Sequence, residues 1–206
     1  MHATQDEPAK MYYADFDGNG NIDPIFTFYV QGKSYPYVSR DELNNQIFAM
    51  RKKFVSYRDY ASATINDLFT PDQLAKADSL TVNELHTSVF INTNGKFVKT
   101  ALPAQAQFSY ISKIIAEDFD KDGNKDLLLF GNHSDNRLKL GSIDAGYGVL
   151  LKGDGKGNFT YVPQPVSGMC IKGDVKSALM MNINKAQYIL AGVTGGSLQV
   201  YKFDDK

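Results

Sequence analysis

Short apolar runs separated by glycine, asparagine and aspartate recur along most of this chain. PIFTFYV begins at Pro24, LLLFG begins at Leu127, and ALMMNI, QYILAGV and LQVYKF follow one another after Ile171. Runs of this length that are rich in β-branched and aromatic residues are typical of β-strands. The pattern therefore predicts a mainly β protein with many short strands.

Two of these runs form hairpin patterns. VFINTNGKF (89–97) and VLLKGDGKGNF (149–159) each lead from an apolar strand through a Gly/Asn turn to an aromatic residue that opens another strand. Each hairpin follows an acidic stretch and a first strand, so one unit occurs twice. A third, degenerate unit starts at Ile171 and has no acidic stretch.

An insertion separates the two halves of the first unit. Phe97 lies 74 residues after Asp23, whereas Phe159 lies 33 residues after Asp126, so the first copy carries 41 additional residues. Helix signals fill this stretch, with start signals at Ser39-x-x-Glu42 and at Thr70-Pro71. Apolar residues recur there at helical spacing: Leu43, Ile47, Met50 and Phe54.

About four strands in a unit of 50–60 residues are typical of a β-propeller blade. We therefore expect 1–206 to form a single β-propeller segment of about three blades. Blade 1 would cover about 11–103 with a helical insert over about 39–82, blade 2 about 104–167, and the degenerate blade 3 about 168–206. Because rings need four to eight blades, the propeller would be partial or open.

Composition narrows the range of partners. The 206 residues carry a net charge of −1, so there is no electrostatic case for binding nucleic acid or an anionic membrane. No apolar run is long enough to span a membrane. The single cysteine, Cys170, excludes an internal disulfide and a cysteine-based zinc site, and its apolar surroundings predict a buried thiol.

Two acidic nonapeptides are the main chemical signal. DFDGNGNID starts at position 15 and DFDKDGNKD starts at position 118. Oxygen-bearing side chains occupy alternate positions of both: Asp15, Asp17, Asn19, Asn21 and Asp23 in the first, and Asp118, Asp120, Asp122, Asn124 and Asp126 in the second. Glycine at position 6 permits a sharp turn. Because such side chains repel one another in a tight loop, the pattern predicts a bound cation at each.

Calcium is the ion that this donor set favours. Ca²⁺ takes six to eight oxygen ligands in flexible cages, whereas Mg²⁺ needs tighter octahedral geometry, and neither loop has the histidine or thiolate typical of zinc sites. An EF-hand is excluded because its twelfth position, a glutamate, would be Phe26 or Leu129. The second loop, with Asp122 where the first has Asn19, is expected to bind more tightly. The alternative is a pair of polar turns.

The loops, their following strands and VLLKGDGKGNF resemble FG-GAP/VCBS propeller repeats, which include the calcium loops of integrin α-subunits. The likeness covers roughly 11–38 and 83–206 and is closest to exported bacterial proteins of the Bacteroidetes type. It implies side-chain ligation at loop positions 1, 3, 5 and 9 and backbone ligation by Asn21 and Asn124. Family propellers usually have about seven blades, so this chain would be a fragment or an open arc.

The resemblance implies a non-catalytic interaction scaffold outside the cytoplasm. The N-terminal stretch MHATQDEPAK has no apolar signal core, so the alternatives are a cytoplasmic protein or part of a longer exported one. Expected partners are a protein or a glycan, including self-association or the remainder of a larger propeller. The alternatives are part of a propeller-fold polysaccharide lyase or hydrolase, or a carbohydrate-binding module that uses six tyrosines: Tyr12, Tyr13, Tyr35, Tyr37, Tyr57 and Tyr60.

Two further motifs have ordinary structural interpretations. HSDN (133–136) places His, Ser and Asp side by side, but members of a catalytic triad converge from separate segments, so a polar loop is expected. GDGKGN (153–158) lacks the spacing of a phosphate-binding loop and lies between strands, so a hairpin turn is expected.

Overall fold

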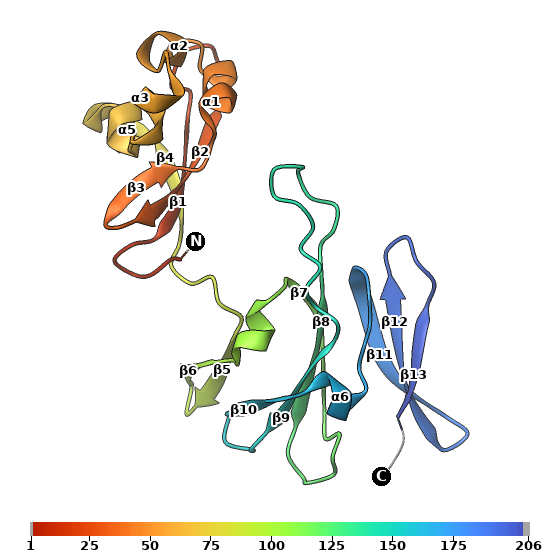
Figure 1. Ribbon diagram of the computed structural model, residues 1–206. Helices are drawn as coiled ribbons and strands as arrows, with labels where there is room; N and C mark the ends of the chain where they lie inside the picture. Colours follow the sequence, from red (N-terminus) through yellow and green to blue (C-terminus); the bar gives the residue numbers. More distant parts are fainter. Residues whose placement is uncertain (1, 204–206) are drawn as a thin grey trace. The chain divides into compact units, whose positions relative to one another are not determined.

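The computed structural model describes residues 2–203 and confirms a mainly β protein. The chain divides between Leu85 and His86 into two compact units, here called unit 1 and unit 2. Figure 1 shows the elements of both units in chain order. The expected first blade, 11–103, therefore spans the boundary between the units.

Unit 1 contains one four-stranded antiparallel sheet. Its strands are β1 (Ala9–Ala14), β2 (Asp23–Val30), β3 (Lys33–Pro36) and β4 (Asp78–Val82), in the order β3-β2-β1-β4. The fourth strand returns to lie beside the first, as in a Greek key. This happens because the helical segment after β3 carries the chain from one edge of the sheet to the other, where β4 pairs with β1.

Five short helices form the insert of unit 1. They are α1 (Arg40–Gln46), α2 (Met50–Lys53), α3 (Tyr57–Ala61), α4 (Ile65–Leu68) and α5 (Pro71–Lys76). The predicted starts are confirmed: Ser39 and Glu42 form a capping box, and Thr70 caps α5 with Pro71 in its first turn. The helical part ends at Lys76, earlier than the expected 82, because residues 78–82 complete the sheet as β4.

The helices bury one face of the first sheet. Ile25 of β2 is fully buried against Leu43, Ile47 and Phe54 of the insert, and Phe69 is 2% exposed in the same cluster. All four predicted helical core positions are therefore confirmed as buried. Burying such side chains contributes roughly 1.5–3 kcal/mol each, so the insert is an integral half of this unit's core.

Unit 2 contains two larger antiparallel sheets and a hairpin. One sheet is a meander of β7 (Ile111–Glu117), β8 (Asp126–Gly131), β9 (Val149–Gly153) and β10 (Phe159–Val162). The other consists of β11 (Val175–Ile183), β12 (Ala186–Val193) and β13 (Gln199–Phe203). The hairpin pairs β5 (Ser88–Thr93) with β6 (Lys96–Ala101). Two short helices complete unit 2: η1 (Ala104–Gln107) follows β6, and α6 (Gln164–Ser167) follows β10. Both predicted hairpins are thus confirmed.

The meander is covered on both faces. Leu128 and Phe130 of β8 pack with Ile189 and Ala191 of β12, whereas Leu129 of the same strand packs on the opposite side. That opposite cluster includes Val89 of the β5–β6 hairpin. Because successive side chains of a strand point to opposite faces, β8 must be apolar almost throughout. The hairpin thus packs in unit 2 instead of joining the sheet of unit 1.

Asn132 connects the two sheets of unit 2. Its side chain is 1% exposed, donates to the carbonyls of Gly146 (2.7 Å) and Gly173 (3.0 Å), and accepts from Ser109 Oγ (2.7 Å). The nearby Asp174 carboxylate accepts from the backbone and hydroxyl of Ser134 at 2.8 and 2.7 Å. These buried bonds fix the loop that follows β8.

Cys170 is exposed, so the predicted buried thiol is wrong. Its neighbours Met169 and Ile171 point into the core, at 6% and 1% exposure, which turns the intervening side chain outward. None of the helices formed by residues 2–203 combines the length and the hydropathy that crossing a bilayer requires.

Tyr60 leads to a testable pH dependence in unit 1. Its hydroxyl donates to the carbonyl of Val38 at 2.6 Å, and burial raises the pKa of Tyr60 to about 12. The ordinary value is about 10. Because the folded state favours the neutral phenol, the stability that Tyr60 contributes is complete below about pH 10 and is lost as the pH rises toward the folded-state pKa.

We therefore expect the melting temperature of unit 1 to fall between about pH 10 and pH 12. Thermal unfolding of the parent chain and of Tyr60→Phe across this range measures the effect. The variant, which has no phenol to ionise at this position, should lose less stability on going to high pH. Equal slopes for the two proteins would contradict the assignment.

Candidate metal centres

The two acidic loops occupy equivalent places in their sheets. The first connects β1 to β2, and the second connects β7 to β8. In both, the aspartate at position 9 is the first residue of the second strand, namely Asp23 in β2 and Asp126 in β8. Each loop therefore joins the first two strands of an antiparallel sheet, as the repeat in the sequence predicts.

Backbone amides organise the first loop around its carboxylates. Asp15 Oδ1 accepts from the amides of Gly18 (2.8 Å) and Asn19 (3.0 Å), and Asp15 Oδ2 accepts from Gly20 (2.8 Å). At the far end, Asp23 Oδ2 accepts from the amide of Phe16 at 3.1 Å. The loop thus folds back on its first aspartate and is closed by its last.

The second loop repeats the bonds donated by the amides of positions 2, 5 and 6. Asp118 accepts from the amides of Asp122 (3.1 Å) and Gly123 (2.9 Å), and Asp126 Oδ2 accepts from Phe119 at 3.0 Å. Position 3 also accepts from the amide of position 5 at 3.2 Å in both loops. The same sequence pattern therefore produces the same local structure in two separate units.

Glycine at position 6 has a conformational reason. Gly20 and Gly123 have φ values of 85° and 89°, in the left-handed region where other residues are strained. The residue at loop position 4 is also left-handed. It is Gly18 in the first loop and Lys121, at φ 60°, in the second. The tight curvature brings the alternating side chains toward one point.

Carboxylates at positions 1, 3 and 9 come together in each loop. One oxygen from each of Asp15, Asp17 and Asp23 lies within 4.8 Å of the others, and Asp118, Asp120 and Asp126 form the equivalent group. The closing aspartates are buried, at 3% and 2% exposure. Burial, together with the charges of Asp17 and Asp15, raises the pKa of Asp23. A cation at this place would offset that unfavourable charge.

The other predicted ligands lie outside these groups of three. Asn19 Oδ1 accepts from the backbone and side-chain nitrogens of Asn21 at 2.8 and 2.9 Å. Asp122 Oδ1 accepts from the amide of Asn124 at 2.9 Å, and its Oδ2 accepts from Lys152 Nζ at 2.9 Å. Ligation by the backbone carbonyls of Asn21 and Asn124 stays a prediction.

Phenylalanine at position 2 anchors each loop to a hydrophobic core. The ring of Phe16 stacks on Phe69 with centroids 3.8 Å apart and an interplanar angle of 19°. Phe119 is 8% exposed and packs against Phe203 with centroids 5.7 Å apart. Because the same residue donates its amide to the closing aspartate, core packing and carboxylate placement are linked in both loops.

Lys152 is a part of the second site that the motif did not predict. Its ammonium contacts the carboxylate of Asp120 as well as that of Asp122. These two hydrogen bonds raise the pKa of Lys152, and the bond to Lys152 is the main cause that lowers the pKa of Asp122. The sequence signal was its place in VLLKGDGKGNF, in the strand that pairs with β8.

The GDGKGN hairpin turn packs against the second loop. Asp154 accepts from the amides of Lys156 (2.8 Å) and Asn158 (3.0 Å), which confirms a turn between β9 and β10. Gly155 has a φ of 69°, in the left-handed region where other residues are strained, and a Cβ there would lie 2.2 Å from Asn124 Oδ1 and displace that side chain. The glycine at position 155 is therefore explained by its backbone conformation and by this close approach.

No protein-family model, curated protein or solved structure matches this chain. The resemblance to FG-GAP/VCBS repeats therefore rests on the sequences of the loops and hairpins themselves.

The HSDN segment forms no triad. The Ser134 hydroxyl donates to Asp174 at 2.7 Å, and the His133 backbone pairs with Ile143 across the loop. The bonds between Ser134 and Asp174 join the loop that follows β8 to the residue that precedes β11. The expected polar loop is therefore confirmed.

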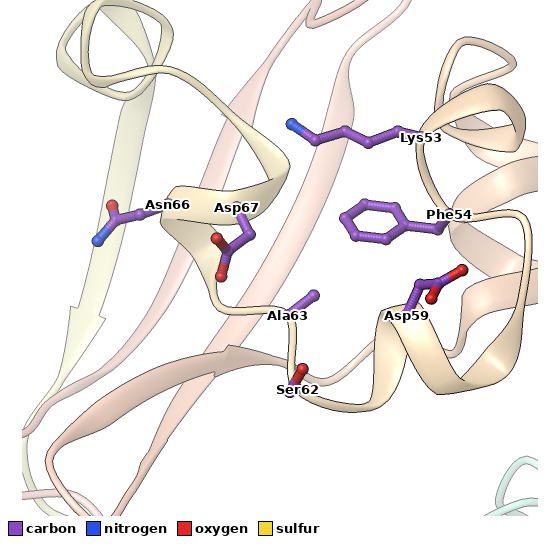
Figure 2. Close-up of a pocket in the computed structure, with 7 residues that line it drawn as sticks. All are labelled: Lys53, Phe54, Asp59, Ser62, Ala63, Asn66 and Asp67. Carbon is purple, nitrogen blue, oxygen red and sulfur yellow. The ribbon is translucent and has the colours of Figure 1, made fainter.

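An open pocket in the insert contains two further carboxylates (Figure 2). Seven residues line it: Lys53, Phe54, Asp59, Ser62, Ala63, Asn66 and Asp67. Asp59 caps α3 by accepting from Ser56, and Asp67 caps α4 by accepting from Thr64. The bonds from Thr64 lower the pKa of Asp67. Both acids thus have a structural role in holding short helices together.

The donor chemistry of the two loops fits a hard divalent cation. Three carboxylates converge in each loop, and backbone amides donate to the first aspartate of each group. Asp15, Asp17 and Asp23 would hold an ion in the first loop, and Asp118, Asp120 and Asp126 would hold one in the second. The ion would supply the positive charge that lets three carboxylates share one place.

Proposed function

We propose that both loops bind Ca²⁺ and that calcium stabilises the two units of a non-catalytic interaction scaffold. The observation that carries this proposal is the recurrence of one three-carboxylate cluster, at loop positions 1, 3 and 9, in two separate units. A polar turn needs no buried acid, yet Asp23 and Asp126 are both buried. Metal binding would add its free energy to folding.

The proposal includes a propeller architecture of the FG-GAP/VCBS kind. A four-stranded meander whose face packs on a following antiparallel sheet is the arrangement of neighbouring blades, and β7–β10 with β11–β13 match it. The first sheet differs, because β4 returns beside β1 instead of continuing a meander. The blade interpretation therefore has most support in unit 2.

An interaction role is supported by the outer face of the last sheet. Leu179, Leu190 and Val200 pair in one row across β11, β12 and β13. Leu179 and Val200 are 52% and 54% exposed. Contiguous exposed apolar side chains are typical of surfaces that bind another protein. A setting outside the cytoplasm, where calcium is abundant enough to fill weak sites, belongs to the same proposal.

Calcium titration followed by NMR tests the proposal directly. The Gly20 and Gly123 amides report the two loops separately, since they donate to Asp15 and Asp118 at 2.8 and 2.9 Å. We expect both amide signals to shift with calcium. At a calcium concentration of about 100 times the dissociation constant, each unit should gain about 2.7 kcal/mol in stability.

Single substitutions provide matched controls for this titration. Asp17→Asn should abolish the Gly20 response alone, and Asp120→Asn should abolish the Gly123 response alone. Magnesium at the same concentration should produce smaller shifts, because it retains its water more strongly. If neither glycine signal moves at about 10 mM calcium, above the range of weak extracellular sites, the loops are polar turns.

Glycan binding is a second candidate, favoured by the open face of the first sheet. Phe26 and Phe28 point away from the helices and meet Tyr37 edge-on, with centroids 6.0 and 6.2 Å apart. Tyr13 and Tyr35 share this face by strand register. Of the other predicted tyrosines, Tyr12 and Tyr60 pack in the core and Tyr57 lies on the insert. A glycan array would separate this candidate from protein binding.

A further inference from the structure

We propose that Lys152 is a tethered cation that competes with calcium for the second loop. In the absence of a divalent ion its ammonium group would hold Asp120 and Asp122 in place, and calcium would have to displace it. This inference rests on the proposed calcium binding. It names Lys152 as the residue that makes the two loops respond differently to the ion.

The position of Lys152 follows from strand register. Leu151 pairs with Leu127, so Lys152 stands opposite Asp126, and side chains of directly opposite residues share one face of a sheet. Its Nζ reaches Asp122 Oδ2 at 2.9 Å and also contacts Asp120. The side chain is 47% exposed. It has room to swing into solvent when an ion takes the Asp120 carboxylate.

The first loop has a different neighbour. In unit 1 the strand after β2 ends at Pro36, and α1 begins at Arg40, so the chain becomes helical where the equivalent of Lys152 would stand. The side chain that α1 brings to this end of β2 is the neutral amide of Gln46, whose Nε2 donates to the carbonyl of Pro24, the residue after Asp23, at 3.3 Å. A neutral amide does not compete with a cation for carboxylates.

Counting charges shows why this difference matters. The oxygen-bearing side chains of the first loop include three aspartates and Asn19, a formal charge of −3, and those of the second include four aspartates, a charge of −4. The second loop also contains Lys121 and Lys125, and Lys125 pairs with Glu117 at 2.8 Å. The ammonium of Lys152 brings the second set back to −3. The additional carboxylate of Asp122 predicts tighter binding at the second loop, whereas the ion pairs with Lys152 offset that advantage. They also keep the second loop formed without calcium.

The test is a calcium titration of Lys152→Met, with Lys152→Arg as the control that keeps the charge. Methionine has nearly the same length and tolerates a half-exposed strand position. We expect the calcium affinity of the second loop, followed through the Gly123 amide signal, to rise about threefold to tenfold in Lys152→Met. This is the range that the loss of two exposed ion pairs would supply. The calcium affinity of the first loop, followed through Gly20, should not change. In Lys152→Arg the affinity of the second loop should stay within about twofold of the parent value. In a chelator, unit 2 of Lys152→Met should melt at a lower temperature than unit 2 of the arginine variant.

The outcomes separate the two proposals. An unchanged or weaker affinity at Gly123 in Lys152→Met, with normal binding at Gly20, would overturn the role of Lys152 and leave calcium binding intact. If neither the Gly20 nor the Gly123 signal of the parent chain shifts with calcium, the calcium-binding proposal itself is overturned, because the two glycines report loops in different units. A rise in affinity in both variants would also count against competition by charge.

Discussion

Replacing Asp126 with alanine is expected to be the most damaging single change in unit 2. Its carboxylate is 2% exposed and accepts from the amides of Phe119 (3.0 Å) and Gly153 (2.9 Å). Alanine leaves both buried donors without a partner, and each such loss costs about 1–3 kcal/mol. We expect unit 2 to lose about 3 kcal/mol even in a chelator, and calcium binding at the second loop to disappear.

Urea unfolding followed through NMR signals of each unit measures this effect. Asp126→Asn is the matched control, because it removes the charge but keeps one oxygen acceptor, so its loss of stability in a chelator should be smaller. Unit 1 should be unaffected in both variants. If Asp126→Ala is as stable as the parent without calcium, the aspartate is a metal ligand alone and does not hold the loop to β9.

Replacing Phe69 with alanine is expected to have the largest effect in unit 1. Its ring is 2% exposed and stacks on Phe16, whose amide donates to Asp23. Large-to-small changes at buried phenylalanines cost about 3–5 kcal/mol. Because Phe16 would lose the surface that positions it, we also expect calcium affinity at the first loop to fall about tenfold, since well-packed neighbours hold the ligands of a metal site.

Two companion variants keep this prediction falsifiable. Phe69→Leu retains most of the volume and should preserve both folding and a measurable calcium affinity that lies between those of Phe69→Ala and the parent. Phe48→Ala removes a phenylalanine that is 65% exposed on the same insert, so its effect on calcium affinity should be negligible. A fall in the calcium affinity of the second loop, reported by Gly123, in any of these variants would contradict the proposed link between insert and first loop. So would an unchanged affinity of the first loop, reported by Gly20, in Phe69→Ala.

The helix starts, the hairpin turns and the acidic loops could be predicted from the sequence because each is stabilised by residues close to one another along the chain. The helix starts at Ser39 and Thr70, the hairpin turns at 92–95 and 153–158, and the two acidic loops each depend on residues within a few positions of one another. A side chain that bonds an amide three to five residues away has the same partners in any fold that tolerates the turn. The two loops confirm this, since they carry the same bonds in different units.

Partners distant along the chain could not be read in this way. Lys152 reaches Asp120 across 32 residues, and Phe69 reaches Phe16 across 53, and no spacing rule connects them. The same reason explains why the expected first repeat spans two units. Residues 78–82 and the hairpin at 88–101 both have strand patterns, and only the choice of edge and of apolar face decided where each one packed.

By itself, the sequence determined the strands, the capped helices and the oxygen-rich loops, because each is stabilised mainly by neighbours along the chain. The tertiary structure alone decided which sheet each strand joins and which side chains become buried beside the loops. It also placed a lysine against the second loop and a neutral glutamine against Pro24 at the end of the first. Those outcomes depend on burying apolar faces that belong to remote segments, and this gain exists only after the whole unit has folded.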